Sequence, residues 1–295
     1  MYGANTDVEE ITYTLAGFVS PDLTTAAETW RKPDKDRSID IGYRSRRLPY
    51  YLGDAGRHKS QIGIRFNEHL SNSDLSTDIS VEYRDRLYGD DWWQFLGNCR
   101  ACLGTEGGSS TFDLDGSLFE HHKEVMDSNP SISYDEYKEQ VLSEYNRDIG
   151  YRTITPRHFE YAAFRCCQIL LEGEYSGVLE PDCHYIPVKR DYSNLEEVLN
   201  KYRDPAVRSR LTENAYTDLI VSDEYTYKSF IQSFDEMLRQ KGFQPGKSAT
   251  LRDTRQTYKR SLRRQKQREW LESVISRAIG AVRRRGDRAL QLLSR

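Results

Sequence analysis

One stretch, residues 153–191, constrains the fold more than any other part of the chain. It reads as a loop, a helix, a strand, a second loop and a second strand. Thr155 can cap a helix with its hydroxyl group, and Pro156 suits the first helical position because the N–H that proline lacks would be unpaired there. The run Gln168–Leu171 is short and apolar, as expected of a strand covered on both faces. We therefore predict an α/β fold with this helix and strand at its centre.

The first turn of this predicted helix carries Arg157 and His158. Unpaired backbone N–H groups at a helix N-terminus attract anions, and these two side chains add positive donors. The stretch therefore predicts a phosphate site that needs no glycine-rich loop. Glu160 follows within one turn, where its carboxylate can accept hydrogen bonds from a sugar or ribose hydroxyl beside the anion.

A second basic cluster follows another predicted strand, Ile39–Tyr43. Arg44, Arg46, Arg47 and Lys59 come after it, and ligands of open α/β sheets bind at the carboxyl ends of strands. A solvated basic turn explains the same residues about equally well. Further along, a predicted strand runs into the sequence GTEGGSS at 104–110, where small residues allow the backbone to approach a ligand.

The strings PRHFEYAAFRCCQILLEG and YSGVLEPDCHYIPVKRDYSNLEEVL resemble the donor-binding C-terminal half of GT-B glycosyltransferases, of the group 1 and spore-maturation-like type that builds bacterial surface polysaccharides. The resemblance covers roughly residues 35–240. It implies a Rossmann-like parallel sheet with flanking helices. The pattern departs at Arg165-Cys166, where the family has a helix-ending glycine, and at Arg152, where it often has an acidic residue.

The resemblance also implies a function and residue roles. The expected activity is transfer of a sugar from a nucleotide-sugar to a hydroxyl group of a polysaccharide or glycolipid, with no metal and no cofactor. Fixed positive groups would stabilise the charge that builds on the leaving diphosphate. The expected catalytic residues are Arg157, Glu106 and His158. The expected donor-binding residues are Arg44, Arg46, Lys59, Gly107, Gly108, Ser109 and Glu160, the last of which would contact the ribose.

Charge divides the chain in two. Residues 251–295 hold 14 Lys and Arg against four Asp and Glu, so the net charge of −3 splits into +10 for this tail and −13 for the rest. Apolar residues between 270 and 282 fall on one helical face, which predicts a basic helix lying on an anionic membrane. A helix packed on another subunit and a disordered tail are the alternatives. Nucleic acid is not an expected partner, because the acidic body would repel phosphate.

We expect three parts: residues 1–34, a strand (11–19) and linker left from an acceptor domain; residues 35–240, the donor domain; and residues 241–295, a linker and the basic tail. No apolar run approaches the roughly 20 residues of a membrane span, and no signal peptide opens the chain. The expected location is the cytoplasm, with peripheral attachment at the inner face of the cell membrane.

The short N-terminal part raises a second hypothesis. A complete GT-B enzyme has two Rossmann-like domains, so the acceptor domain is either truncated or supplied by another chain, or catalysis has been lost. The alternative function is therefore a non-catalytic, donor-domain-like partner or scaffold in a membrane-associated polysaccharide complex.

Other motifs carry weaker signals. Asp113-Leu114-Asp115 matches the acidic triplet of metal-dependent glycosyltransferases, but such triplets arise often by chance. Cys99 and Cys102 lack a second pair at zinc-site spacing, and five cysteines fit reduced thiols. No hydrolase, metalloprotease or P-loop motif is present.

Overall fold

The computed structural model describes residues 12–145, 150–243, 258–261 and 263. The chain divides into two compact units, Met1–Phe234 and Asp235–Arg295. The sheet and the cleft described below belong to the first unit. The predicted amphipathic helix at 270–282 lies outside the described residues.

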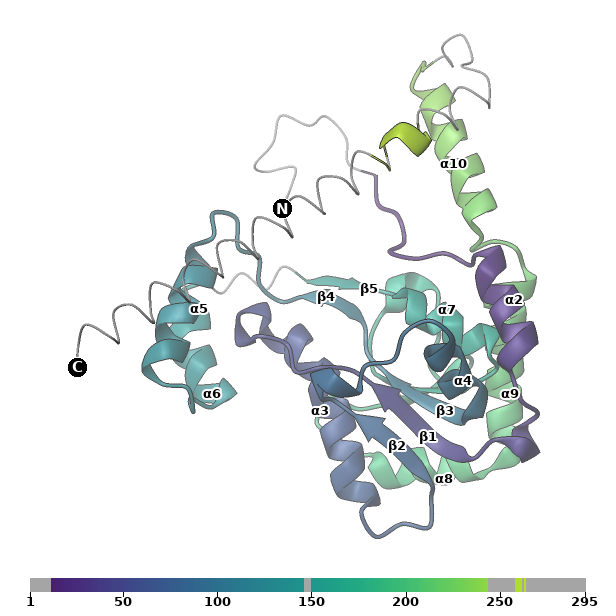
Figure 1. Cartoon of the computed structure of the whole chain (residues 1–295), viewed down its shortest axis with the longest axis horizontal. Coiled ribbons are helices and arrows are strands. Elements are labelled where there is room, and N and C mark those ends of the chain that lie inside the picture. The colour runs from purple at the N-terminus through teal and green to yellow at the C-terminus, as the bar shows by residue number, and fades with distance from the viewer. Residues whose placement is uncertain (1–11, 146–149, 244–257, 262, 264–295) are drawn as a thin grey trace, which may run out of the picture. The chain divides into compact units, whose positions relative to one another are not determined.

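Five parallel strands form a central sheet in the order β2-β1-β3-β6-β7 (Figure 1). Their bounds are Ile39–Arg44 (β1), Thr77–Ser80 (β2), Cys99–Gly104 (β3), Cys167–Leu171 (β6) and Tyr185–Val188 (β7). The order reverses at β1, because β2 lies on one side of it while β3, β6 and β7 follow on the other. This open parallel sheet with flanking helices confirms the predicted Rossmann-like α/β class.

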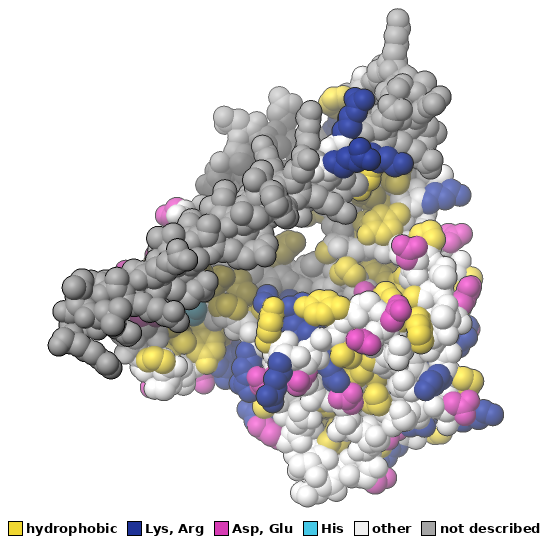
Figure 2. All heavy atoms as spheres, in the orientation of Figure 1, with side chains coloured by type: hydrophobic (Ala, Val, Ile, Leu, Met, Phe, Trp, Pro, Cys, Tyr) yellow, Lys and Arg dark blue, Asp and Glu magenta, His cyan; other side chains and the backbone are white. Residues whose placement is uncertain are grey.

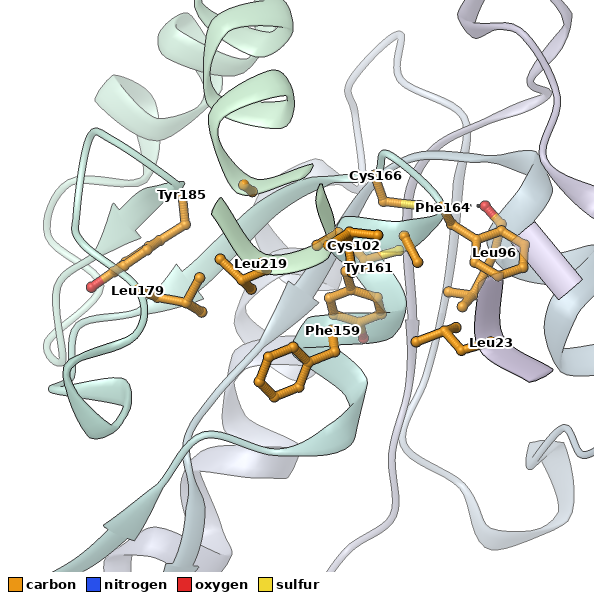
Figure 3. Packing of buried hydrophobic residues seen from close by; sticks show 14 of the residues in the cluster. Leu23, Leu96, Cys102, Phe159, Tyr161, Phe164, Cys166, Leu179, Tyr185 and Leu219 are labelled. Carbon is orange, nitrogen blue, oxygen red and sulfur yellow. Dashed lines mark hydrogen bonds between the residues drawn. The ribbon is translucent and has the colours of Figure 1, made fainter. Parts of the chain in front are cut away.

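Helices cover both faces of the sheet (Figure 1). One face packs against α2 (Pro21–Trp30), α4 (Asp90–Asn98) and α7 (Pro156–Ala163), and the other against α3 (Gly53–Leu70) and α8 (Leu195–Arg203). The alternation of a strand is visible in β3, since Cys102 belongs to the first buried cluster while its neighbours Ala101 and Leu103 belong to the second. Figure 3 shows Phe159 and Tyr161 of α7 within the first cluster, together with Leu23 and Leu96.

The chain forms further elements besides this sheet and its covering helices. A two-stranded antiparallel ribbon pairs β4 with β5. The bounds are Gly107–Ser109 (β4), Tyr151–Thr153 (β5), Ser117–Ser128 (α5), Tyr134–Tyr137 (α6), Pro205–Tyr216 (α9) and Tyr227–Gln240 (α10). Single 3-10 turns occupy 34–36, 50–52, 83–85 and 175–177, and π-helical turns occupy 138–142 and 217–221.

The central stretch forms as predicted. Helix α7 begins at Pro156 with Thr155 as its cap, and it ends at Ala163, just before the Arg165-Cys166 pair that stands where the family has a helix-ending glycine. The chain turns there because Arg165 adopts a left-handed conformation with φ 50°. A glycine would adopt this φ without steric cost, so the residue type departs from the family pattern while the turn remains.

The predicted N-terminal strand at 11–19 is wrong. The described residues 12–19 form no strand, and only an isolated bridge joins Val19 to Thr226. Val19, Leu23 and Ala27 are buried in the first core cluster. The segment up to Trp30 therefore packs as part of the α/β body, while the expected domain boundaries stay a prediction.

Candidate anion-binding cleft

A cleft of about 570 Å³ opens at the carboxyl ends of β1 and β3. Tyr43 and Arg44 line it from β1, and Gly104 lines it from β3. Strands β1 and β3 are the neighbours between which the strand order reverses, and open α/β sheets bind ligands at that point. Figure 2 shows Lys and Arg side chains close to hydrophobic ones in the middle of the face that it displays.

The cleft brings together most of the residues that the sequence predicted. The expected site residues that line it are Arg44, Arg46, Lys59, Arg157, His158 and Glu160. The basic cluster after β1 and the start of α7 thus face one cavity, although Arg157 and Arg44 are 113 positions apart.

Arg157 is held by three contacts, and Glu160 is the carboxylate whose charge acts on it, without a direct ion pair. Its Nη1 donates a hydrogen bond of 2.7 Å to the carbonyl oxygen of Arg44. Its guanidinium carbon lies 5.2 Å from the ring centroid of Trp92 and 6.0 Å from that of Tyr43. Among the residues that the structure describes, no carboxylate forms an ion pair with Arg157. The arrangement orients a positive charge toward the cleft.

Lys59, on α3, is the second cation of the cleft. Its ammonium group makes no hydrogen bond or ion pair with any described residue. Burial, followed by repulsion from Arg157 and Arg46, lowers the pKa of Lys59 below its ordinary value. Several positive charges gathered beside a single carboxylate mark a place where an anionic ligand would be stabilised.

Arg44 lines the cleft, but its charge is already paired. Its Nη2 lies 2.7 Å from both carboxylate oxygens of Asp78, and its guanidinium stacks on the ring of Phe95 at 4.5 Å. The charge of Arg44 is therefore compensated by Asp78 of the neighbouring strand β2, and its backbone carbonyl orients Arg157. Arg46, in contrast, is exposed and forms no ion pair within the described part of the chain.

His158 belongs to the cap of α7. Its Nδ1 accepts a hydrogen bond of 3.0 Å from the backbone N–H of Thr155, which places the proton of the neutral ring on Nε2. Burial lowers the pKa of His158 to about 3, against a smaller opposing effect of the Thr155 backbone. The ring is therefore neutral near pH 7, but a pKa of about 3 makes it too weak a proton acceptor for an efficient general base. The geometry thus favours a structural role over the expected catalytic one.

Glu160 is the one carboxylate among the described residues that line the cleft. Its Oε2 accepts a hydrogen bond of 3.0 Å from Nε1 of Trp92. Burial raises the pKa of Glu160, whereas Trp92 and Arg157 act in the opposite direction. The other oxygen, Oε1, accepts no hydrogen bond from a described residue.

Glu106 and the segment 107–109 do not line the cleft. Oε1 of Glu106 accepts hydrogen bonds from the backbone N–H groups of Glu174 (3.2 Å) and Tyr175 (2.9 Å). The carboxylate also borders a separate cavity of only about 10 Å³. Glu106 therefore fixes the turn after β6, and the structure does not bring it to the other expected catalytic residues.

The Gly-Gly pair is part of a strand rather than a ligand-binding turn. Gly108 has φ 116°, and a Cβ there would lie 1.9 Å from the carbonyl oxygen of Tyr151 on β5. Ser109 Oγ and Ser110 N hydrogen-bond to the carbonyl of Leu52. The segment thus pins the start of α3, the helix that carries Lys59.

The aromatic wall of the cleft was not predicted from the sequence. Arg86, Tyr88, Trp92 and Trp93 line it from the loop after β2 and from α4. The alternation of charged and aromatic residues in this segment is a signal, but WWQFL also reads as an ordinary amphipathic helix.

Two weaker motifs have structural roles. Asp113 accepts hydrogen bonds from the N–H groups of Leu118 and Phe119 at the start of α5, and Asp115 accepts one from Ser117. Cys99 and Cys102 are buried.

Within the described ranges, no group of three His, Cys, Asp or Glu side chains is placed to hold a metal ion. No helix of these ranges is long and apolar enough to cross a membrane.

The geometry defines an α/β domain with a cationic cleft at its topological switch point. No protein-family model and no curated protein matches the sequence. Similar solved structures include a glycosyltransferase from Rickettsia africae ESF-5, at 11% identity over 75% of this chain and 52% of that one, with a TM-score of 0.34. Another is the C-terminal domain of a glycosyl transferase group 1 family protein (LpcC) from Francisella tularensis, at 11% identity over 72% of this chain and 97% of that one, with a TM-score of 0.31.

The chain spans about half the length of the Rickettsia protein. Both scores are too low to support a function, and the α/β class rests on the parallel sheet itself.

Proposed function

We propose that the protein is a glycosyltransferase that binds a nucleotide-sugar in this cleft and transfers the sugar to a hydroxyl group of a polysaccharide or glycolipid. One observation carries the proposal. Lys59 and Arg157 face the cleft at the switch point of the sheet, and neither forms an ion pair with a described carboxylate. A diphosphate is the kind of ligand that would compensate both charges.

The residues suggest how the transfer would be assisted. Negative charge builds on the diphosphate as the glycosidic bond breaks, and cations fixed in advance stabilise that charge without reorganising. Arg157 is fixed in this way by Arg44 and Trp92. Lys59 and the exposed Arg46 add charge from the side of α3 and the loop after β1. Oε1 of Glu160 would accept a hydrogen bond from the ribose.

A second candidate function is binding without turnover. The observation that favours it is that no described cleft residue is left over as a base: Glu160 bonds Trp92 through one oxygen and is assigned to the ribose through the other, and the pKa of His158 is about 3. Activation of an acceptor hydroxyl would then depend on groups outside this cleft, such as an acceptor-domain chain. In that case the protein would act as a partner or scaffold of a membrane-associated polysaccharide complex.

A binding measurement followed by a turnover assay separates these candidates. We expect UDP, GDP or ADP to bind the full chain in isothermal titration calorimetry. The matching nucleotide-sugar should then be hydrolysed or transferred slowly. Tight binding with no turnover, also in the presence of acceptor glycolipid, would favour the scaffold. Failure of all three nucleotides to bind would refute both candidates.

The basic tail supports a further part of the proposal. Residues 251–295 carry a net charge of +10 and an amphipathic pattern, which would attach the protein to the anionic inner face of the cell membrane. Attachment there would place the cleft near a lipid-linked acceptor.

A further inference from the structure

An exposed aromatic and cationic pair lies at the cleft, in the loop that connects β2 to α4. The guanidinium carbon of Arg86 lies 4.9 Å from the ring centroid of Tyr88 and 5.4 Å from that of Tyr83. Both Arg86 and Tyr88 line the cleft, whereas Tyr83 does not. Arg86 forms no ion pair with any described residue, and 63% of Tyr88 is exposed.

Tyr88 differs from the other aromatic residues of the same wall. Trp92 is half-buried, with its indole stacked near Phe95 at 5.6 Å and its Nε1 bonded to Glu160. Trp93 is half-buried too and stacks on Phe164 at 5.6 Å. These two rings support the core, while most of the Tyr88 side chain remains available to a ligand.

We propose that the Tyr88 ring, together with the Arg86 guanidinium, binds the base of a nucleotide whose diphosphate lies between Lys59 and Arg157. The inference rests on the proposed function and names the part of the ligand that this wall recognises. Every nucleobase presents a flat π-face, and aromatic rings and arginine guanidinium planes are the groups on which such faces stack. Removal of one stacking ring typically costs about 1–3 kcal/mol, which corresponds to a loss of roughly fivefold to 150-fold in affinity.

The test compares two ligands that differ in the base. The probes are inorganic pyrophosphate and whichever of UDP, GDP and ADP binds the unaltered chain most tightly. Tyr88→Ala should weaken binding of the nucleoside diphosphate at least fivefold and change that of pyrophosphate less than twofold. Tyr88→Phe, which keeps the ring, should retain affinity for both. Tyr13→Ala is the matched control, because that ring is 91% exposed and does not line the cleft.

Several results would overturn the inference without touching the anion site. Equal weakening of both probes by Tyr88→Ala would mean that the ring only shapes the cleft, and no weakening of either would remove it from recognition. An unaltered chain that binds pyrophosphate as tightly as every nucleotide would show that no base is recognised. Failure of the unaltered chain to bind any probe would instead refute the proposed function.

Discussion

Two positive side chains, Lys59 and Arg157, set the chemistry of the cleft, and neither forms an ion pair within the described part of the chain. The sequence indicated both residues. Lys59 comes after the predicted strand 39–43, and Arg157 lies in the first turn of the predicted central helix, both expected at the ligand-binding edge of the sheet. The compensation of Arg44 by Asp78 was not predictable. It depends on the parallel pairing of β1 with β2, in which Asp78 lies opposite Gly42, and no local pattern reveals that register.

Replacing Arg157 by alanine tests the central cation. If Arg157 meets a phosphate, Arg157→Ala should weaken binding of the best nucleoside diphosphate by about 1.5–3 kcal/mol in calorimetry, the range of a charged hydrogen bond. Arg65→Ala is a suitable control, since Arg65 pairs with Glu68 on α3 and does not line the cleft. Unchanged affinity in Arg157→Ala would remove this residue from the site.

Lys59 gives a prediction about stability. Because its pKa is lowered in the folded state, chiefly by burial and then by Arg157, the folded protein holds this proton less tightly than the unfolded chain. The charged Lys59 therefore lowers the free energy of unfolding at pH 7. This loss of stability disappears as pH rises from the pKa of Lys59 in the folded protein to its higher pKa in the unfolded chain. Lys59→Met should raise the free energy of unfolding at pH 7, and this gain should shrink near pH 10.

Urea denaturation of the ligand-free proteins at the two pH values measures this effect. A Lys59→Met variant that is less stable than the unaltered protein at pH 7 would contradict it. The same variant should bind pyrophosphate more weakly, which links the cost in stability to a role in binding.

Elements show where sequence reasoning succeeded and where it failed. The start of α7 was predictable because Thr155 and Pro156 act locally, through a cap and a fixed backbone angle. The role of 107–109 was not predictable. A glycine that allows a ligand to approach and a glycine that allows a neighbouring strand to approach look identical in sequence. Here the structure shows the second case, because the carbonyl of Tyr151 lies against Gly108.

The β4–β5 ribbon can be tested through its glycine. Gly108→Ala should cost more than about 1–3 kcal/mol of unfolding free energy, because a collision with the Tyr151 carbonyl adds to an unfavourable φ. Gly116→Ala is the matched control: its φ is 85° but nothing lies within 4 Å of the added carbon, so about 1 kcal/mol is expected. A small cost for Gly108→Ala, accompanied by a large loss of nucleotide affinity, would instead restore the ligand-loop interpretation.

The cap of α7 predicts a pH dependence. His158 has a pKa of about 3 in the folded protein, whereas an unfolded chain protonates histidine below about pH 6.5. The unfolded chain therefore binds one more proton between these values, and the free energy of unfolding falls as pH decreases from 6.5 toward 3. The loss attributable to this residue reaches about 2 kcal/mol at pH 5. His158→Gln should show a shallower decline between pH 7 and pH 5 in denaturant titrations, and an identical decline would exclude His158 as its source.

On the scale of the whole molecule, the uneven charge of the chain is the feature with most consequence. The division of the net charge into −13 and +10 can be read from the sequence alone. The location of the cleft depends on the strand order, and the sequence predicted only the α/β class of the sheet. Only the three-dimensional arrangement of β1, β3 and α7 shows that two basic segments distant in sequence line the same cavity.

The tail predicts salt-dependent membrane attachment. The full chain should sediment with vesicles that contain phosphatidylserine and much less with neutral phosphatidylcholine vesicles, and raised salt should release it. A chain ending at residue 243 should remain in the supernatant with both. Equal sedimentation of the two chains would assign the attachment, if any, to the α/β body.

The repulsion between Lys59 and Arg157 affects the stability of the ligand-free protein. Without a bound anion, the burial of the charged Lys59 and its repulsion from Arg157 both lower the stability of the fold. A polyphosphate entering the cleft would reverse that effect, and heat resistance in the cell would then track the supply of ligand.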